Sequence, residues 1–409
     1  MTRVSRRNLF AGAGGGLALG AAAGFGAAHA VGDDTTAARD AVDLTRSYDF
    51  YTGDHQAGIA TPPQRHCIFM TFDMVDGVSA ADLQVLLARW SAAIAQLMAG
   101  EPVGQVEPVR SGAVGTDTGE ALDLAPASLT VTLGLGPGLF DDRFGLASKR
   151  PKLLEDLPAL PSDQLRPGTT GGDLALQACA DDPQVAYHAI RDLARMGKGV
   201  VDTGWTVMGF GRASAGAGQS TPRNLMGFKD GTRNIEETAD LDEHVWIDDD
   251  PAWAGGTYWV VRKIQMNIET WDADDVADQQ QVFGRTKVEG APLSGRVEHD
   301  EPDFSATKDG APVIPPTSHV ALAAPENNGG TRILRRGYNY TDGINELAQL
   351  DAGLLFVGFC NDPASFIKLQ TRLGTSDRLN EYISHIGSAL FVAPPAPRRG
   401  HYLGEALFG

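Results

Sequence analysis

Two hydrophobic periods, one of two residues and one of 3.6, recur in the same order in both halves of the chain and restrict its fold most strongly. Side chains repeat every second residue along a strand and about every 3.6 residues along a helix. Leu129, Val131 and Leu133 alternate like one face of a strand, and Ser79 with Asp82 forms a capping box ahead of a helix. The first half therefore predicts strands at residues 67–72, 128–135, 173–178 and 205–210, with helices at 79–97 and 183–196.

The second half repeats this order of elements. Its patterns predict strands at residues 258–268, 333–340 and 354–359, with helices at 274–283 and 363–373. The order strand, helix, strand, strand, helix, strand is that of a ferredoxin-like unit. We therefore expect an α+β protein built from two tandem ferredoxin-like domains with antiparallel sheets.

A segment rich in glycine, serine and alanine separates the two halves. Residues 211–222 have the composition of a linker or a long loop. Residues 31–60 are polar with few large apolar side chains, which indicates a flexible lead-in. The predicted domains therefore span residues 61–215 and 216–409. The 49 glycines in 409 residues exceed the usual share of about 7% and agree with many turns and long loops.

The first thirty residues have the features of an export signal. The paired arginines Arg6 and Arg7 precede an uncharged run rich in glycine and alanine, which ends in Ala28-His29-Ala30. A short helix or membrane anchor is the alternative, but seven glycines would make a poor spanning helix. We expect a twin-arginine signal peptide over residues 1–30, read by the twin-arginine export machinery, whose cleavage leaves no integral membrane segment. The expected location is the periplasm, the cell envelope or the outside of the cell.

Acidic residues outnumber basic ones. The chain has 52 Asp and Glu against 34 Lys and Arg, a net charge of −18, and a pI near 4.8. Cleavage of the signal removes three arginines and makes the net charge −21. Such a surface repels nucleic acid, so we expect no nucleic-acid partner, and it favours neutral or cationic small molecules.

Common catalytic and binding motifs are missing from the sequence. It contains no HExxH pair and no GxSxG nucleophile elbow, and its glycine cluster near the start belongs to the export signal. The three cysteines, Cys67, Cys179 and Cys360, lie far apart in apolar runs, which indicates buried thiols rather than a disulfide framework. A functional site must therefore be assembled from residues that are distant in the chain.

Three short segments could supply such a site, although each has an ordinary structural alternative. Asp230 lies in Gly227-Phe228-Lys229-Asp230-Gly231, where Asp-Gly is also a common turn. His319 follows two prolines, and a lone histidine there is more often a surface or core residue than a ligand. Arg335 and Arg336 are adjacent on a strand and point to opposite faces, so one faces inward if the sheet is covered. Two solvated arginines at a strand edge are the alternative.

Taken together, these segments resemble the dye-decolourising peroxidases, a family of haem peroxidases. The family's Gly-x-x-Asp-Gly element, its Ser-His segment and its strand arginine match residues 227–231, residues 318–319 and Arg335. The resemblance covers roughly residues 60–395, and the family's two ferredoxin-like domains agree with the expected architecture. With its twin-arginine signal, the sequence is most similar to the exported subgroup that includes deferrochelatase-type peroxidases. Other matching stretches are 256–263, 268–271 and 350–357.

The resemblance implies haem b, iron protoporphyrin IX, bound in the C-terminal half with His319 as the axial ligand of the iron. It makes Asp230 the acid and base that moves a proton on hydrogen peroxide. It makes Arg335 the cation that orients the peroxide and stabilises developing negative charge. The implied reaction is peroxide-dependent oxidation of dyes, phenols or other small organic reductants through a ferryl intermediate.

The same resemblance implies roles for four further residues. Many relatives have an arginine soon after the histidine, where this chain has Val320-Ala321, so Arg233 becomes the candidate for a haem propionate contact. Asp351 is the candidate carboxylate behind the axial histidine. Leu354 and Phe356 are candidates for the apolar wall over the distal haem face, and ordinary strand core is the alternative for both.

Other functions stay open from the sequence. The deferrochelatase-type relatives suggest release of iron from haem for iron uptake, and a cofactor-free exported scaffold protein is a third hypothesis. If a bulky reductant cannot reach the haem, electrons would pass through aromatic side chains, for which Tyr338, Tyr340, Trp259 and Trp271 are candidates. The sequence does not specify the oligomeric state, and a homo-oligomer is compatible with it.

Overall fold

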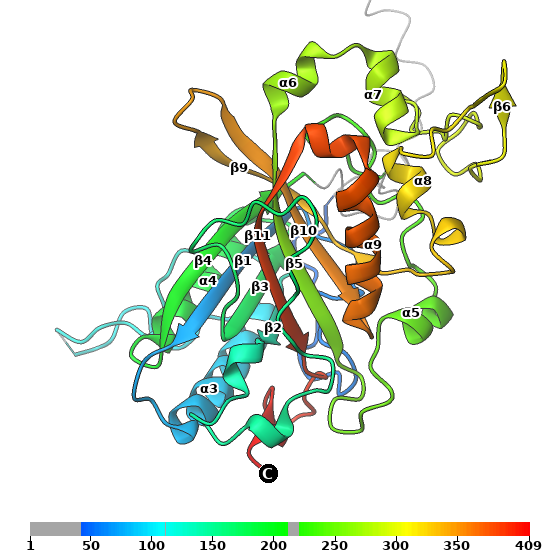
Figure 1. The fold of residues 1–409 in the computed structure, drawn as a ribbon. Coiled ribbons are helices and arrows are strands. Elements are labelled where there is room, and N and C mark those ends of the chain that lie inside the picture. Colours follow the sequence, from blue (N-terminus) through cyan, green and yellow to red (C-terminus); the bar gives the residue numbers. More distant parts are fainter. Residues whose placement is uncertain (1–41, 111, 212–220) are drawn as a thin grey trace, which may run out of the picture. The chain divides into compact units, whose positions relative to one another are not determined.

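The structure is a computed structural model that describes residues 42–110, 112–211 and 221–409 (Figure 1). The expected export signal, the start of the lead-in and most of the expected linker at 211–222 lie outside these residues. The described residues belong to one compact unit. The expected division into two domains at residue 215 stays a prediction.

The first half forms the six predicted elements in the predicted order. They are β1 (His66–Met74), α3 (Ala80–Met98), β2 (Thr130–Leu135), β3 (Leu174–Ala180), α4 (Pro183–Gly197) and β4 (Val201–Phe210). The strands pair antiparallel in the order β2-β3-β1-β4, which is the order of a ferredoxin-like sheet. Helix α3 begins with the expected capping box of Ser79 and Asp82, and it packs against α4, which contacts β1 and β3.

The second half builds an equivalent sheet. Its main elements are β5 (Thr257–Met266), α6 (Ile268–Ala273), α7 (Val276–Phe283), β8 (Leu334–Arg335), β9 (Tyr338–Ile344), β10 (Leu350–Cys360), α9 (Pro363–Ser376) and β11 (Ile383–Ala393). The strand order β11-β5-β10-β9 repeats that of the first half. Shorter elements are α5 (Thr238–His244), α8 (His319–Ala323), the hairpin β6 (Thr307–Lys308) with β7 (Ala311–Pro312), and the 3-10 turns 137–139, 147–149, 325–327, 378–381 and 405–407.

The structure departs from the predicted strands of the main sheet in the second half at two places. The predicted strand at 333–340 is divided into β8 and β9 at Arg336-Gly337, yet the register with β10 is the same on both sides of this break and shifts only between Asp351 and Ala352. The final strand of the unit, β11, has no counterpart among the segments that the sequence patterns assign. Polar and apolar residues do not alternate regularly in the sequence of β11, so no period of two residues marks it.

The two four-stranded sheets join along both edges into one closed ring of strands. Phe210 at the end of β4 pairs with Asn339 of β9, and Val392 of β11 pairs with Leu135 of β2. The strands of the second half run across the centre of Figure 1 next to those of the first, with α9 lying beside β10. Because every main strand has two neighbours, the ring has no long open edge in the described residues.

Three hydrophobic cores follow from this arrangement. One lies between the first sheet and the α3–α4 layer and includes Phe72 and Trp90. A second lies between the two sheets, where Phe69 meets Trp259 edge-on. A third and smaller core surrounds Trp271 near α6 and α7. The third core lies beside the cavity described below.

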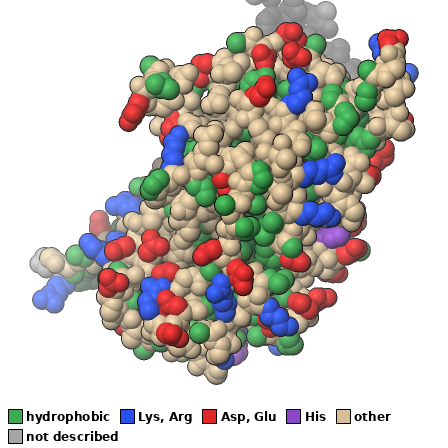
Figure 2. All heavy atoms as spheres, in the orientation of Figure 1, with side chains coloured by type: hydrophobic (Ala, Val, Ile, Leu, Met, Phe, Trp, Pro, Cys, Tyr) green, Lys and Arg blue, Asp and Glu red, His purple; other side chains and the backbone are tan. Residues whose placement is uncertain are grey.

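Acidic and basic side chains are interspersed on the face shown in Figure 2. Among the described residues, no helix combines the length and the apolar character that crossing a bilayer requires.

Candidate active site

A cavity of about 250 Å³ in the second half contains most of the residues that the sequence singles out. Its walls come from the loop at 224–235, from helices α8 and α9, and from strands β5, β8, β10 and β11. Asp351 does not line it. The predicted site residues that do line it are His319, Asp230, Arg335, Arg233, Leu354 and Phe356.

His319 is the first residue of α8 and presents its imidazole to the cavity. Its Nδ1 atom lies 2.6 Å from Oδ2 of Asp377, whose carboxylate is almost fully buried. Because Nδ1 is engaged there, Nε2 is the nitrogen available to the cavity, where 33% of the side-chain surface remains accessible. Burial disfavours the imidazolium, but the Asp377 carboxylate outweighs burial and raises the pKa of His319.

The surroundings of His319 fix its orientation. Ser318 caps α8, and its hydroxyl donates a hydrogen bond of 2.7 Å to the carbonyl of Pro315. The ring of Phe283 meets the His319 imidazole edge-on, with 6.1 Å between ring centroids. Asp377 itself ends α9 and caps the following turn. The imidazole is therefore held by a helix start, a ring and a buried carboxylate.

Asp230 lies in a loop that other segments hold in place. The guanidinium of Arg223 donates to three backbone carbonyls of this loop and of residues 287–288. Glu298 accepts hydrogen bonds from Lys229 and Thr232, which lie on either side of Asp230. The Asp230 side chain is 31% accessible and lines the cavity. The loop is thus fixed while the carboxylate stays open to the cavity.

Arg335 lies beside Asp230 in the cavity wall, with 3.7 Å between its Nη1 and Oδ1 of Asp230. Its Nη2 donates to the carbonyl of Thr232 at 3.1 Å. Asn234 holds the backbone of Arg335 with both ends of its amide: Nδ2 donates to the Arg335 carbonyl at 2.8 Å, and Oδ1 accepts from its N–H at 3.0 Å. A carboxylate and a guanidinium are therefore positioned as a pair, and both act electrostatically on His319.

The neighbouring Arg336 points to the opposite face, as the alternation of a strand requires. It is 1% exposed and donates to the carbonyl of Thr61 and to the side-chain oxygen of Gln64. The expectation that one arginine of the pair faces inward is met by Arg336. Arg335 is not simply solvated, because it faces the cavity.

Strand β10 supplies both a cavity wall and part of a core. Leu354 and Phe356 line the cavity, and Phe356 packs against Phe366 of α9 with 5.9 Å between ring centroids. Leu355 and Val357, the intervening residues, lie in the core between the sheets. Of the two alternatives for Leu354 and Phe356, the structure shows a cavity wall, and the core lies on the opposite face of β10.

The aromatic residues considered as electron relays are all buried. Tyr338, Tyr340 and Trp259 belong to the core between the sheets. Trp271 belongs to the third core, where its Nε1 donates to the carbonyl of Met226 at 3.0 Å. Each of them therefore has a core position.

Two arginines that line the cavity have acidic partners. Arg233 pairs with Glu326 and lies 3.1 Å from a carboxylate oxygen of Glu301. Arg332 pairs with Asp240 at 2.5 Å. Both guanidinium groups lie where the carboxylates of a cavity-bound ligand could compete for them.

The prediction that Asp351 lies behind the axial histidine is wrong. Its Oδ1 accepts a hydrogen bond of 2.9 Å from Nε2 of Gln265, because both side chains lie on the paired strands β10 and β5. Asp377 occupies the expected position instead. Asp377 comes directly after helix α9 and lies 58 residues after His319 in the sequence. No local motif marks it. Asn234 was also missed, although it lies in the segment that contains Asp230.

These residues fit haem. A single imidazole with Nδ1 tied to a buried carboxylate is the arrangement that orients an axial nitrogen ligand. The apolar wall of Leu354 and Phe356 suits the face of a macrocycle, and the cavity-lining guanidinium groups suit propionates. The fold and the site together define a haem-binding oxidoreductase.

Comparisons with known proteins identify the family. The model of the N-terminal domain of Dyp-type peroxidases matches residues 56–211, and the model of the C-terminal domain matches residues 221–398. The chain therefore belongs to the Dyp-type peroxidase family. A curated relative named deferrochelatase from Escherichia coli is 37% identical over 420 residues, covering 98% of this chain and 96% of the relative. A deferrochelatase from Yersinia pestis is 38% identical over 424 residues, covering 98% and 94%.

Solved structures agree with this assignment. The oxyferrous complex of DtpA from Streptomyces lividans has a TM-score of 0.84 and 39% identity, covering 90% of this chain and 98% of that one. A Dyp-type peroxidase from Cellulomonas bogoriensis has a TM-score of 0.80 and 37% identity, covering 89% and 98%. The predicted α+β fold of two ferredoxin-like units is confirmed. The protein is a haem peroxidase, an oxidoreductase that uses haem as its cofactor.

Proposed function

We propose that His319 is the axial ligand of the haem iron and that Asp230 and Arg335 form the catalytic pair for hydrogen peroxide. The observation that supports this assignment is the convergence of three groups on one cavity: the Asp377-bound imidazole, the Asp230 carboxylate and the Arg335 guanidinium. Haem, when bound at His319, would supply redox-active iron for the reaction with peroxide.

Within this pair, Asp230 transfers the proton and Arg335 stabilises the negative charge. The carboxylate of Asp230 accepts a proton from one peroxide oxygen and returns it to the other. Arg335 stays cationic at every relevant pH, so its guanidinium orients the peroxide and stabilises negative charge as it develops. Asn234 and Thr232 hold Arg335 in the position that this role requires.

Arg233 is proposed to contact a haem propionate. It lies at the cavity and already binds carboxylates, those of Glu326 and Glu301. A propionate would exchange with or join these partners, because guanidinium groups bind carboxylates in bidentate geometry. The electron donor is proposed to be a dye, a phenol or another small organic reductant.

Three substitutions test the assignment. His319→Ala removes the imidazole and should abolish the Soret band of purified protein. Arg335→Leu should keep that band and slow the reaction with peroxide by about 100- to 1000-fold, the usual effect of losing one such donor. Asp230→Asn should also keep the band and slow the reaction by about 100-fold or more. Stopped-flow absorbance measures the rates.

Asp351→Asn is the matched control for Asp230→Asn, because it removes the same charge outside the cavity. It should leave the reaction with peroxide at the wild-type rate. Full haem content in the His319→Ala protein, or a wild-type peroxide rate in both the Asp230→Asn and Arg335→Leu proteins, would refute the assignment.

We also propose export by the twin-arginine route. The paired arginines and the uncharged run that follows support it. Replacing both Arg6 and Arg7 with lysine keeps the charge and should retain the precursor in the cytoplasm. Cell fractionation and N-terminal sequencing of the exported form measure the outcome, and a mature form beginning at Val31 is expected. Unchanged export of the lysine variant would contradict the proposal.

Release of iron from haem is a second candidate function. The supporting observation is the set of relatives named deferrochelatase, which match 98% of this chain. Incubation of the protein with haem under reducing conditions, followed by porphyrin fluorescence, tests it. Metal-free protoporphyrin in amounts that depend on His319 would support this function, and intact haem alone would exclude it.

A further inference from the structure

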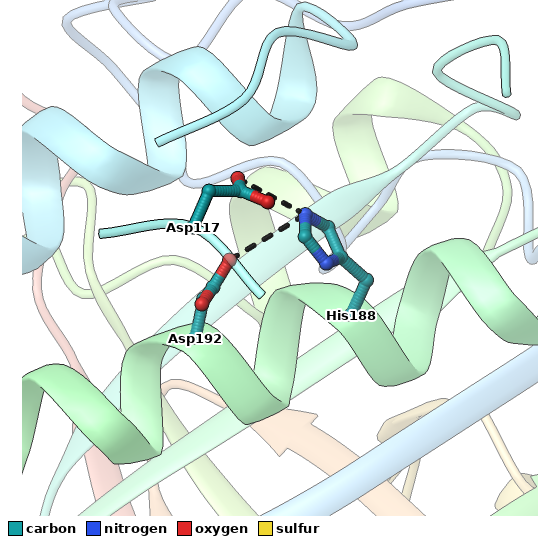
Figure 3. A group of neighbouring side chains, drawn as sticks. All are labelled: Asp117, His188 and Asp192. Carbon is teal, nitrogen blue, oxygen red and sulfur yellow. Dashed lines mark ion pairs between the residues drawn. The ribbon is translucent and has the colours of Figure 1, made fainter. Parts of the chain in front are cut away.

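A second cluster of acidic residues and a histidine lies in the first half of the chain, away from the haem cavity. Figure 3 shows the carboxylates of Asp117 and Asp192 directed at the same ring nitrogen of His188. Nε2 of His188 lies 3.4 Å from Oδ2 of Asp117 and 3.5 Å from Oδ2 of Asp192. His188 and Asp192 are one turn apart on α4, and Asp117 comes from the long loop between α3 and β2.

The cluster is buried and its polar atoms lack sufficient partners. The exposed fractions are 3% for Asp117, 4% for His188 and 0% for Asp192. Neither carboxylate oxygen of Asp192 has a hydrogen-bond partner by distance and angle, and the hydroxyl of the nearby Thr118 donates to Glu120 instead. A fully buried carboxylate without a donor is costly unless a cation binds it.

The other ring nitrogen of His188 is already held. Nδ1 lies 2.9 Å from Oε2 of Glu120, and the second oxygen of Glu120 accepts from Arg191. Hydrogen bonds from Thr118, His188 and Arg191 outweigh burial and lower the pKa of Glu120 to about 2. An imidazole whose Nδ1 proton is fixed by a carboxylate presents Nε2 as a metal ligand, as in carboxylate–histidine–zinc triads.

A bound cation would also balance the charge of the cluster. Asp117, Glu120 and Asp192 contribute three negative charges, and Arg191 contributes one positive charge. With the neutral imidazole that metal binding requires, the cluster has a net charge of −2. One divalent ion would neutralise it.

The spacing of the atoms matches a tetrahedral ion. Two ligand atoms that are each about 2.0–2.1 Å from a tetrahedral ion lie about 3.3–3.4 Å apart, close to both separations at His188. All three ligand atoms lie within 4.8 Å of one another. A small decrease in the distance between the Asp117 and Asp192 oxygens would therefore bring all three atoms within bonding distance of one ion. A cavity of about 80 Å³ borders Asp117 and His188 and has room for water as a fourth ligand.

We propose that Asp117, His188 and Asp192 bind one divalent transition-metal ion of the zinc type. Nothing in the peroxidase reaction assigns this site. One imidazole with two carboxylates suits zinc, whereas calcium and magnesium prefer sites made entirely of oxygen ligands. The ion would hold the loop to α4. Asp117 organises this loop by accepting hydrogen bonds of 2.7 Å from the backbone N–H groups of Val103 and Gly119.

Zinc titration of the haem-loaded protein tests the site. The protein is first treated with EDTA and then equilibrated with zinc chloride, and metal content is measured by mass spectrometry after removal of free ions. The expected result is about one zinc per chain besides the haem iron, with a higher unfolding temperature. A large excess of calcium or magnesium should not displace the zinc. Absence of bound zinc in the wild type would overturn the proposal.

Variants locate the bound ion. Asp117→Asn combined with Asp192→Asn should abolish zinc binding and the thermal shift, while the haem spectrum stays unchanged. Glu120→Gln should weaken zinc binding by about 10- to 100-fold, as expected for a residue that orients a ligand. Asp123→Asn is the control, because Asp123 is exposed on the same loop and borders the same cavity.

Each result is decisive. Zinc bound equally by the double variant and the wild type would overturn the proposal, as would equal loss of zinc in the Asp123→Asn protein. If the double variant fails to fold, zinc binding by the wild type and the zinc affinity of the Glu120→Gln protein still test the proposal.

Discussion

The carboxylate that holds His319 lies 58 residues further along the chain and belongs to the end of another helix. The sequence resemblance pointed to Asp351, which is near several matching residues of β10. A carboxylate can support a histidine only from within hydrogen-bond distance, and that distance is set by how α8 and α9 pack. A carboxylate hydrogen-bonded to the histidine could be predicted from the sequence. That Asp377 supplies this carboxylate could not.

Asp377→Asn should weaken haem binding by about 10- to 100-fold while the fold is retained. The amide keeps the shape and one acceptor oxygen, but the negative charge that makes the His319 imidazole a stronger donor is lost. Titration of haem-free protein with haem, followed at the Soret band, measures the affinity. Asp351→Asn removes the same charge without touching His319 and should bind haem normally. Equal affinities of the two variants would contradict the role of Asp377.

Asn234→Ala should slow the reaction with peroxide by about tenfold while haem content stays normal. The substitution removes two hydrogen bonds to the Arg335 backbone, each worth about 0.5–1.5 kcal/mol, so the guanidinium loses its fixed position. Stopped-flow rates measure the effect. Asn361→Ala is the control, because Asn361 donates to the carbonyl of Glu243 and does not line the cavity. Rates that fall equally in both variants would exclude a positioning role.

At the scale of elements, the predictions succeeded for helices with one buried face and also for strands that are buried throughout, such as β2 and β3. Helix α3 has its capping box and its apolar stripe in the predicted places. Strand β11 was missed because polar and apolar residues do not alternate regularly in its sequence, so no period of two residues marks it. Helix α8, which has only five residues, is too short for a periodic signal, and its cap residue Ser318 is its main local mark.

Gly284→Ala should disturb the start of α8 and therefore His319, the proposed axial ligand. Gly284 ends α7 with φ +79°, and an added Cβ would lie 2.7 Å from Oγ of Ser318. Gly199→Ala is the matched control, since Gly199 has φ +89° and open space around the added Cβ. Both variants should lose about 1–2 kcal/mol of unfolding free energy from backbone strain. Only Gly284→Ala should also weaken haem binding, and a similar loss in Gly199→Ala would contradict this account.

At the scale of the whole molecule, the two ferredoxin-like units share their sheets. The pattern of elements predicted each unit, but no local pattern predicted that β4 pairs with β9 or β11 with β2. These contacts join strands that are more than 120 residues apart, and they are fixed by the closure of the ring rather than by neighbouring residues. The cavity and the core between the sheets lie on opposite faces of β5 and β10. One face of these strands lines the cavity, and the other face packs in the core that stabilises the whole molecule.

A buried neutral histidine should make the whole protein less stable in acid. His385 is 4% exposed, and burial, followed by the charges of Arg262 and His319, lowers its pKa to about 3. Its pKa in the unfolded chain is about 6.5, so protons bind the unfolded state first. Its contribution to stability is complete above pH 6.5 and is lost as the pH falls towards 3.

The expected loss from this one histidine is about 2 kcal/mol between pH 7 and pH 5. His385→Gln removes the titrating group, so the variant should lose about 2 kcal/mol less than the wild type over this interval. Urea unfolding at the two pH values measures the difference. His401→Gln is the control, because the His401 side chain is 61% exposed. This substitution should leave the loss of stability between pH 7 and pH 5 as it is in the wild type. If His385→Gln loses as much stability as the wild type, another group is responsible for the acid sensitivity of this fold.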